Sequence, residues 1–260
     1  MKIHNIVLIG SGNLATNLAI VFVKAGLNIQ CIYSRNIAHA QILADKIGTL
    51  YTDNLNELPR TADLYLISIS DSAIQQVVHQ LAECKGIFAH TSGSIDISVF
   101  ADTCSDYGVF YPLMNFSATS VFEFKHIPLC IEAHSDENHK ALESLGKMIS
   151  NHVQNLDSAN RKITHLAAVF VCNFTNLNYI IAEEILAKHH LSFDLLRPLI
   201  LETAIKAQSN SPMQLQTGPA IRNDKDVLDA HIRLLDTLPE YKEIYKLLTK
   251  NIQRKRNEKL

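Results

Sequence analysis

Residues 9–15 read Ile-Gly-Ser-Gly-Asn-Leu-Ala, a G-x-G-x-x-A pattern that follows a short apolar run. The spacing of apolar residues after it predicts a helix over residues 13–25. In a strand-turn-helix context, Gly10 makes the tight turn, Gly12 lets the backbone approach a pyrophosphate, and Ala15 lets the helix pack closely on the strand. The pattern therefore predicts a dinucleotide-binding turn, with a bare glycine turn as the structural alternative.

From this turn to about residue 155, apolar runs alternate with helical patterns. The runs predict strands at residues 3–9, 29–33, 64–69, 87–90, 109–111 and 129–132. The patterns between them predict helices at residues 13–25, 38–47, 72–81 and 137–149. Since strands that alternate with helices are joined by right-handed crossovers, we expect an α/β fold with a Rossmann-type, doubly wound and mostly parallel sheet.

The second half of the chain has a different character. Eight of the nine glycines lie within the first 146 residues, and only Gly218 lies beyond them. Helical patterns fill residues 159–190, 194–208, 225–236 and 240–254. The sequence therefore predicts a nucleotide-binding domain over residues 1–155 and an all-helical substrate and dimerisation domain over residues 156–260.

The end of the second predicted strand indicates which dinucleotide is bound. Folds that bind NAD usually carry an acidic residue here, but residues 33–36 read Tyr-Ser-Arg-Asn, and the first acidic residue of the chain is Asp45. Ser34 can donate a hydrogen bond, and Arg35 can pair with a phosphate dianion. The site therefore favours NADP(H) over NAD(H); the alternative is that Arg35 is only a solvated cation at the start of a helix.

Ligands of open α/β sheets bind outside the carboxyl ends of the strands, so the residues after each strand are candidates for binding. After the strand at 64–69 we expect Ser68 and Ser70 to border the cofactor, although Ser70 or Asp71 could instead cap the next helix. The predicted cofactor-binding residues are Gly10, Gly12, Asn13, Leu14, Ser34, Arg35, Ser68 and Ser70.

The loop after the strand at 87–90 reads His-Thr-Ser-Gly-Ser and supplies two candidates for chemistry. His90 could donate a proton to a developing alkoxide or amine, and Ser92 could hydrogen-bond the nicotinamide or the substrate. The alternative is that this loop is purely structural, with Ser94 as the cap of a helix at residues 96–101.

Two further groups of polar residues lie in the helical half. His165, Cys172 and Asn176 recur on about one face of the long helix, with Asn173 adjacent, and could face the nicotinamide or be hydrogen-bonded core residues. The turn at 217–224 holds Arg222, a candidate clamp for a carboxylate or phosphate, while its Asn223 and Asp224 could merely cap a helix. The predicted catalytic residues are His90, Ser92, His165, Asn173 and Arg222.

Composition excludes several classes of protein. Apolar residues make up 47% of the chain, and 24 Lys and Arg against 26 Asp and Glu give a net charge of -2, so neither disorder nor nucleic-acid binding is expected. The basic end, residues 250–259, fits a solvated helix terminus. The histidines at 134, 139, 189 and 190 lack the spacing of metal ligands, so no metal is expected.

The cysteines and the apolar runs bear on the compartment. Five isolated cysteines without C-x-x-C spacing favour a reducing cytoplasm. The longest apolar run of the second half, residues 166–172, is much shorter than the roughly 20 residues that span a bilayer, so no membrane segment is expected.

Together these segments resemble a family. The turn at 10–15, Ser-Arg at 34–35, His-Thr-Ser-Gly-Ser at 90–94, Tyr-Pro-Leu-Met-Asn-Phe-Ser at 111–117, Ala-Ala-Val-Phe-Val-Cys-Asn-Phe at 167–174 and Thr-Gly-Pro-Ala-Ile-Arg-Asn-Asp at 217–224 are similar to bacterial NADP oxidoreductases with a Rossmann-like domain and a C-terminal helical domain of unknown function. The likeness covers nearly the whole chain. That family resembles deazaflavin-dependent NADP reductases, pyrroline-5-carboxylate reductases and the 6-phosphogluconate dehydrogenase group, whose helical domain often dimerises. The resemblance implies NADP as cofactor and a homodimer formed through the helical domain.

Two residues depart from the family pattern. Tyr111 stands where the family usually has His, and Asn223 where it usually has Gly. The first departure puts a general acid at that position in doubt, although a tyrosine can also donate a proton. Hydroxyacid relatives use a lysine at the start of the long helix as the catalytic acid, and Lys162 and His165 are the nearest candidates here.

The leading hypothesis is an NADP(H)-dependent oxidoreductase that moves a hydride between nicotinamide and a small carbonyl, imine or hydroxyacid in the cleft between the two domains. The alternative is an NADP-binding sensor or assembly protein without turnover. A deazaflavin as hydride partner is a third possibility.

Overall fold

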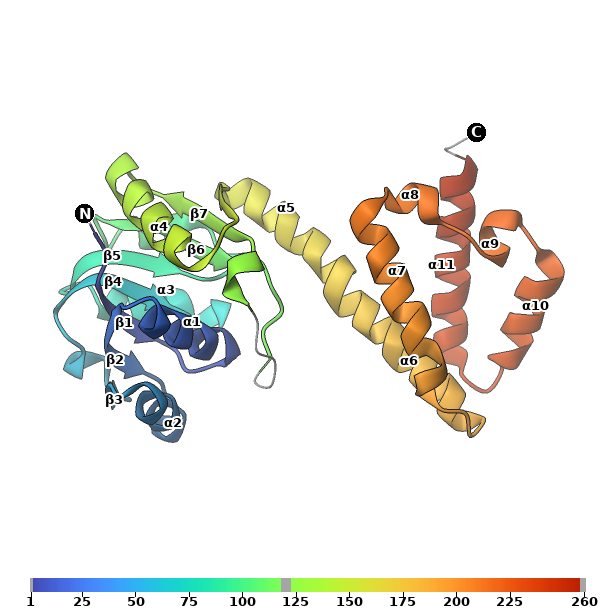
Figure 1. The fold of residues 1–260 in the computed structure, drawn as a ribbon, viewed down its shortest axis with the longest axis horizontal. Coiled ribbons are helices and arrows are strands. Elements are labelled where there is room, and N and C mark those ends of the chain that lie inside the picture. Colours follow the sequence, from blue (N-terminus) through green and yellow to red (C-terminus); the bar gives the residue numbers. More distant parts are fainter. Residues whose placement is uncertain (1, 118–122, 258–260) are drawn as a thin grey trace. The chain divides into compact units, whose positions relative to one another are not determined.

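The computed structural model describes residues 2–117 and 123–257 (Figure 1). Residues 258 and 259, the end of the predicted basic segment, lie outside the described part of the chain. The chain divides into two compact units, Met1–Asn173 and Phe174–Leu260.

The first unit contains one eight-stranded sheet with the order β3-β2-β1-β4-β5-β6-β7-β8. Its strands are β1 (Asn5–Ile9), β2 (Asn28–Tyr33), β3 (Leu50–Thr52), β4 (Thr61–Ile67), β5 (Lys85–His90), β6 (Tyr107–Pro112), β7 (Leu129–Ala133) and β8 (Val153–Asn155). All neighbouring strands are parallel except β6 and β7, which are antiparallel. The predicted Rossmann-type, mostly parallel sheet is confirmed.

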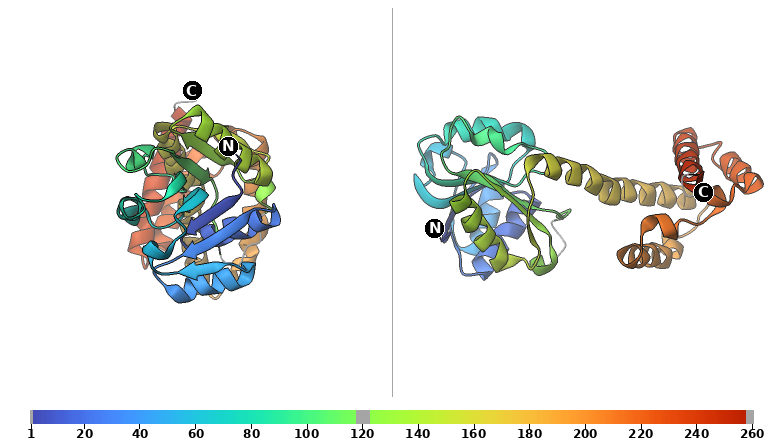
Figure 2. Two further views of the ribbon diagram at one scale, coloured as in Figure 1. Left: turned by 90° about the vertical axis from the view of Figure 1, so that its left-hand side faces the viewer. Right: turned by 90° about the horizontal axis from the view of Figure 1, so that it is seen from above.

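Helices cover both faces of this sheet. They are α1 (Asn13–Lys24), α2 (Ile37–Ile47), α3 (Asp71–Gln80) and α4 (Asp136–Ile149), and α5 (Ser158–Val169) follows the last strand. Along β1, Ile6 and Leu8 belong to the core beneath α1, α2 and α4, and Val7 and Ile9 belong to the core beneath α3. This alternation follows from the period of two in a strand, and Figure 2 shows α3 on the face opposite α1 and α4.

Side-chain caps place several helix ends where the sequence has polar residues. The Asn36 side chain accepts the backbone N–H of Ala38 at 3.1 Å and starts α2, which ends at the left-handed Gly48. The Asp157 carboxylate accepts the backbone N–H of Asn160 at 2.8 Å and starts α5. Asp157 thereby marks the change from sheet to helix that the sequence predicts near residue 155.

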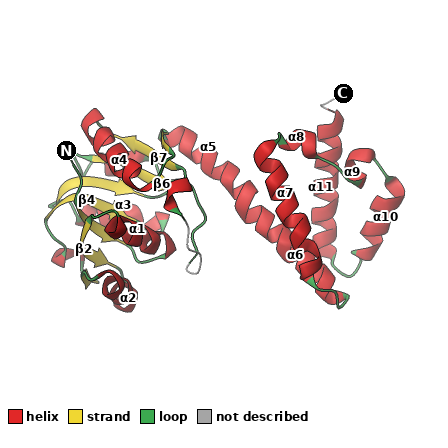
Figure 3. Cartoon of the chain, in the orientation of Figure 1, coloured by secondary structure: helices red, strands yellow, loops and turns green. Residues whose placement is uncertain are grey.

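In the described part of the second unit, helices joined by loops are the only regular secondary structure (Figure 3). Its helices are α6 (Thr175–Lys188), α7 (Arg197–Ser209), α8 (Pro212–Leu215), α9 (Pro219–Arg222), α10 (Lys225–Leu234) and α11 (Pro239–Asn257). Lys188 Nζ donates to Thr237 Oγ1 at 2.7 Å, which joins α6 to the segment just before α11. His231 Nδ1 lies 2.8 Å from Tyr245 Oη, which joins α10 to α11. The predicted domain boundary after residue 155 stays a prediction, since the sheet ends at Asn155 and the first compact unit continues to Asn173.

Helix α5 continues into α6 through a π-helical turn at Phe170–Phe174. Residues 158–188 thus form one helix of 31 residues that is long and apolar enough to cross a membrane, by length and composition only. The sequence prediction rested on unbroken apolar runs and so did not register this helix, whose apolar residues are interrupted by polar ones.

Candidate functional site

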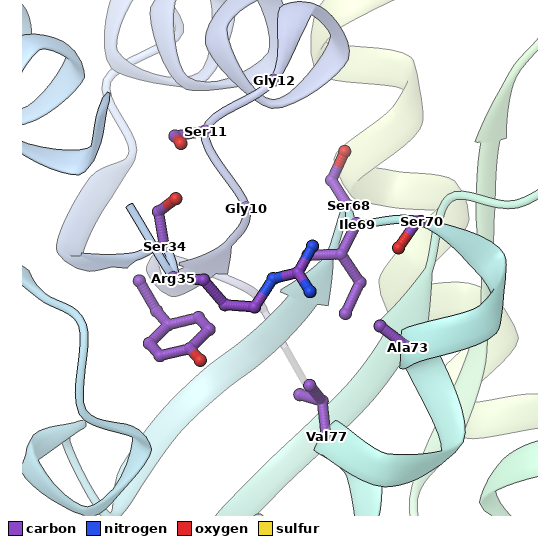
Figure 4. Close-up of a pocket in the computed structure, with 11 residues that line it drawn as sticks. Gly10, Ser11, Gly12, Ser34, Arg35, Ser68, Ile69, Ser70, Ala73 and Val77 are labelled. Atoms are coloured by element: carbon purple, nitrogen blue, oxygen red, sulfur yellow. The ribbon is translucent and has the colours of Figure 1, made fainter. Parts of the chain in front are cut away.

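A pocket of about 290 Å³ opens at the carboxyl edge of the sheet, where β1, β2 and β4 end side by side (Figure 4). It is lined by Gly10, Ser11, Gly12, Tyr33, Ser34, Arg35, Ser68, Ile69, Ser70, Ala73 and Val77. Strand order places it where ligands bind in doubly wound sheets, because the order reverses at β1: β2 and β3 lie on one side of β1, and the chain then returns to place β4 on the other side.

The two glycines of the first turn have different surroundings. Gly10 has φ +126° and donates its N–H to Tyr33 O at 2.8 Å, and a Cβ there would lie 2.0 Å from Ser68 O. Gly12 is the N-cap of α1, makes no side-chain cap hydrogen bond, and a Cβ there would meet nothing within 4 Å. Backbone N–H groups at a helix N-terminus favour an anion, so the open space at Gly12 fits a pyrophosphate.

The second-strand residues complete the pocket on the side of β2. Ser34 Oγ accepts the backbone N–H of Asn36 at 3.3 Å, which leaves its hydroxyl hydrogen for another acceptor. Arg35 is exposed, and its side chain reaches across the pocket toward Ser68 and Ile69 (Figure 4). None of the described lining residues is acidic, so a phosphate dianion on the ribose would meet a guanidinium and hydroxyls and no carboxylate.

Hydrogen bonds join the pocket to the loop after β5. Asp71, the first residue of α3, accepts a hydrogen bond from the Ser94 hydroxyl through Oδ2. Ser92 Oγ accepts the backbone N–H groups of Ser94 and Ile95, both at 3.1 Å. Asp71 therefore connects the loop after β4 to the loop after β5. The cap of the following 3-10 turn is Asp96 and not Ser94, since Asp96 accepts the Ser98 N–H at 3.2 Å.

His90 is fully buried at the end of β5. Its Nδ1 accepts the backbone N–H of Ser92 at 3.2 Å, and its ring stacks on Phe100 with centroids 5.6 Å apart. Burial, with the positive charge of Arg161 as the next cause, lowers the pKa of His90 to about 3. The side chain is thus a neutral imidazole at ordinary pH, and this disfavours it as a proton donor.

Tyr111, near the end of β6, meets His165 of α5. The Tyr111 hydroxyl lies 3.0 Å from His165 Nδ1, and the two rings meet edge to face. Gly93 fits against both rings: a Cβ there would lie 2.6 Å from His165 Nδ1 and 2.9 Å from Tyr111 Cζ. Burial raises the pKa of Tyr111 to about 12.

A buried ion pair holds the start of α5 in place. Arg161 is fully buried and pairs with Glu132 Oε2 of β7. Its guanidinium also donates to Ile95 O at 2.5 Å and to Ser158 Oγ at 3.0 Å. Because His165 lies one helical turn after Arg161, this pair fixes the helix that carries His165.

Comparison with known proteins agrees with this geometry. A family model described as "NADP oxidoreductase coenzyme F420-dependent" matches residues 5–98, and a domain of unknown function, DUF2520, matches residues 127–252. The "putative NADP oxidoreductase" BF3122 of Bacteroides fragilis is 43% identical, with a TM-score of 0.92, and the match covers 96% of this chain and 98% of that one. The chain belongs to this family of NADP oxidoreductases. No curated protein matches it.

More distant solved structures share the fold of this oxidoreductase. A reductive aminase from Aspergillus terreus, solved with NADPH and ethyl-5-oxohexanoate, has a TM-score of 0.73 at 14% identity, and the match covers 99% of this chain and 95% of that one. An imine reductase from Myxococcus stipitatus, solved with NADP+, has a TM-score of 0.68 at 13% identity over 98% of this chain and 93% of that one.

The structure brings together most of the site residues that the sequence predicts in the first unit. Six of the eight predicted cofactor-binding residues line the pocket, and Asn13 and Leu14 open α1 beside Gly12. Ser92 and His165 adjoin Gly93, and His90 lies beneath them in the core. Their catalytic roles stay predictions.

The remaining predicted residues of the oxidoreductase are exposed. Asn173 lies in the π-helical turn, and the neighbouring Cys172 Sγ accepts a hydrogen bond from Asn115 Nδ2 at 3.4 Å. Arg222 ends α9 in the second unit, where Asp224 caps α10 by accepting the Val227 N–H at 3.5 Å. Among the described residues, no group of three His, Cys, Asp or Glu side chains could hold a metal ion.

The sequence shows Tyr111 only as a departure from the family and does not indicate that it meets His165. The two residues are 54 positions apart, so only the pairing of β6 in the sheet and the position of α5 bring them together. Gly93 is a signal in the sequence, because a glycine can mark a position where other side chains approach the backbone closely. The sequence does not indicate which side chains these are.

Proposed function

We propose that this oxidoreductase binds NADPH in the pocket at the carboxyl edge of the sheet and transfers hydride between it and a small carbonyl, imine or hydroxyacid. The observation that carries the proposal is the lining of the pocket. Gly12 exposes backbone at the N-terminus of α1, and Ser34 and Arg35 present a hydroxyl and a guanidinium with no acidic lining residue.

Residues of this protein would hold the cofactor at two groups, its pyrophosphate and its 2'-phosphate. The α1 N-terminus, with Asn13 and Leu14 in its first turn, would hold the pyrophosphate, and Arg35 and Ser34 would hold the 2'-phosphate by an ion pair and a hydrogen bond. Ser68 and Ser70 border the pocket on the β4 side. When bound, the nicotinamide supplies or accepts the hydride. The reductive aminase and the imine reductase of the same fold, solved with NADPH and NADP+, support this class of reaction.

The test is a panel of small ketones, cyclic imines, oxoacids and hydroxyacids assayed with NADPH or NADP+ by the absorbance of reduced nicotinamide. Coenzyme F420 belongs in the panel because the name of the matching family model includes it. We expect turnover with at least one carbonyl or imine. Tight NADPH binding without turnover on any member would contradict the proposal and favour the sensor.

We also propose that the helical half forms a homodimer and that the protein works in the cytoplasm. Ile163, Leu166 and Val171 are 66%, 59% and 77% exposed on the long helix, an unusual concentration of apolar surface for a monomer. A second copy of the helix would cover it, and this explains the apolar composition of residues 158–188 without a membrane. The five cysteines are free, as expected in a reducing compartment.

A further inference from the structure

The Tyr111–His165 pair is a polar cluster that has no assigned role in the proposed function. Tyr111 lies near the carboxyl end of β6, which runs parallel to β5, so its hydroxyl lies at the same edge of the sheet as the pocket. Contacts between two loops connect the pair to the pocket. Asp71 follows the pocket residue Ser70 and accepts a hydrogen bond from the Ser94 hydroxyl, and Gly93, next to Ser94, packs against both rings of the pair. The pair therefore adjoins the side of the pocket formed by the end of β4 and the start of α3.

The other candidate donors at this edge are committed elsewhere. His90 is fully buried and neutral, and its Nδ1 is used by the Ser92 N–H. Lys162 Nζ pairs with Asp96 Oδ2 at 2.8 Å. Ser92 Oγ accepts two backbone N–H groups and has the Ser94 hydroxyl 3.4 Å away. Tyr111 differs from these candidates. Its hydroxyl is ionisable, and the imidazole of His165, which can carry a proton, lies 3.0 Å from it.

We infer that Tyr111 is the catalytic residue that protonates the substrate's carbonyl oxygen or imine nitrogen during reduction, and that His165 positions its hydroxyl and restores its proton. The inference rests on the proposed function, because the nicotinamide has to supply the hydride. It assigns a proton donor at the position where the sequence departs from the family.

Tyr111 and His165 pass the proton in two steps. The O–H bond of Tyr111 breaks as a new O–H or N–H bond forms on the substrate, which has gained a hydride at carbon, and Tyr111 is left as a phenolate. An Nδ1–H of His165 then gives its proton to the phenolate oxygen, 3.0 Å away. His165 is only half-buried and regains a proton from solvent. In reverse, the same groups take the proton from an alcohol or amine.

The surroundings keep the phenol protonated between turnovers. Asp71 of α3 and Cys130 of β7 disfavour the phenolate, Arg161 of α5 favours it, and burial dominates, which raises the pKa of Tyr111 to about 12. His165, also from α5, faces the hydroxyl directly. A phenol with this environment holds its proton at working pH and, once ionised, recovers it readily.

The first test compares Tyr111→Phe with Tyr107→Phe, a buried tyrosine on the same strand that stacks on His134. With a substrate found in the panel, Tyr111→Phe should lower kcat about 10²- to 10⁴-fold while the Kd for NADPH changes less than about twofold. Tyr107→Phe should keep the wild-type kcat. Equal activity of wild type and Tyr111→Phe would overturn the inference and leave the proposed function standing, whereas absence of turnover by wild type would overturn both.

The second test concerns His165 and the free protein. His165→Asn keeps a hydrogen-bonding group near Nδ1 and should retain more of kcat than His165→Leu, with similar KM and NADPH affinity in both. Equal losses would show a merely structural role and overturn the assignment to His165. In the ligand-free protein, the tyrosinate absorbance that is lost in Tyr111→Phe should appear near pH 12. Its appearance near the ordinary value of about 10 would show a solvated phenol and overturn the inference.

Discussion

The two glycines of the first turn make separate contributions, one to folding and one to binding. Gly10 has a backbone conformation that side chains rarely adopt, and a Cβ there would lie 2.0 Å from Ser68 O. At Gly12 φ is -74°, and the space beside it is open. The same substitution at the two positions therefore separates stability from cofactor affinity.

We predict that Gly10→Ala lowers the free energy of unfolding by at least about 2 kcal/mol, because it combines backbone strain with a clash against Ser68. Gly12→Ala should change that free energy by less than about 1 kcal/mol. It should nevertheless weaken NADPH binding at least about tenfold, because its Cβ occupies the space left for the pyrophosphate. Urea unfolding and calorimetric titration measure the two effects. Unchanged NADPH affinity in Gly12→Ala would contradict the assignment of the turn.

His90 gives the stability a pH dependence. The folded protein keeps it neutral down to about pH 3, whereas in the unfolded chain it takes up a proton near pH 6.5. Stability contributed by His90 is therefore lost as the pH falls from about 6.5 toward 3, at up to about 1.4 kcal/mol per pH unit. In His90→Asn, the slope of unfolding free energy against pH between about 4.5 and 6 should be smaller by about this amount. The exposed His79→Asn should keep the wild-type slope; identical slopes in all three proteins would refute the assignment.

At the scale of elements, two neighbouring residues of α5 show how burial changes the loss of stability when an ion pair is broken. Arg161 pairs with Glu132 inside the protein, and Lys162 pairs with Asp96 where both side chains are 45% exposed. We predict that Arg161→Leu costs about 3–5 kcal/mol, because it leaves Glu132 and Ile95 O without their partner. Lys162→Ala should cost about 1 kcal/mol or less. Equal costs in urea unfolding would show that the buried pair does not fix α5.

The strands that the sequence predicts are those with continuous apolar runs, because burial on both faces of a parallel sheet requires such runs. Strands β3 and β8 were not predicted; each is a three-residue strand at one edge of the sheet and is mostly exposed. The glycine turn and Arg35 could be predicted because their spacing is local. The contact of Tyr111 with His165 could not, since it depends on the sheet order and on the buried pair at Arg161.

At the scale of the whole molecule, the homodimer makes a prediction that the long helix can test. Leu166→Glu combined with Val171→Glu should convert a dimer to a monomer in sedimentation velocity, since it places charges on apolar surface that a second copy would cover. Ile42→Glu on α2, at a residue that is 68% exposed, is the control and should leave the dimer intact. A wild-type monomer, or a dimer that survives the double substitution, would contradict the proposal.

At the carboxyl edge of the sheet, we propose that Arg35 selects NADPH, and calorimetric titration of wild type and Arg35→Ala with NADPH and NADH tests this selection. Arg60→Ala, in an exposed pair with Glu83, is the control. We predict that wild type and Arg60→Ala bind NADPH at least about tenfold more tightly than NADH, since a charged hydrogen bond contributes about 1.5–3 kcal/mol, and that Arg35→Ala removes this preference by weakening the binding of NADPH alone. An NADPH preference that is unchanged in Arg35→Ala, or a wild type that prefers NADH, would contradict it.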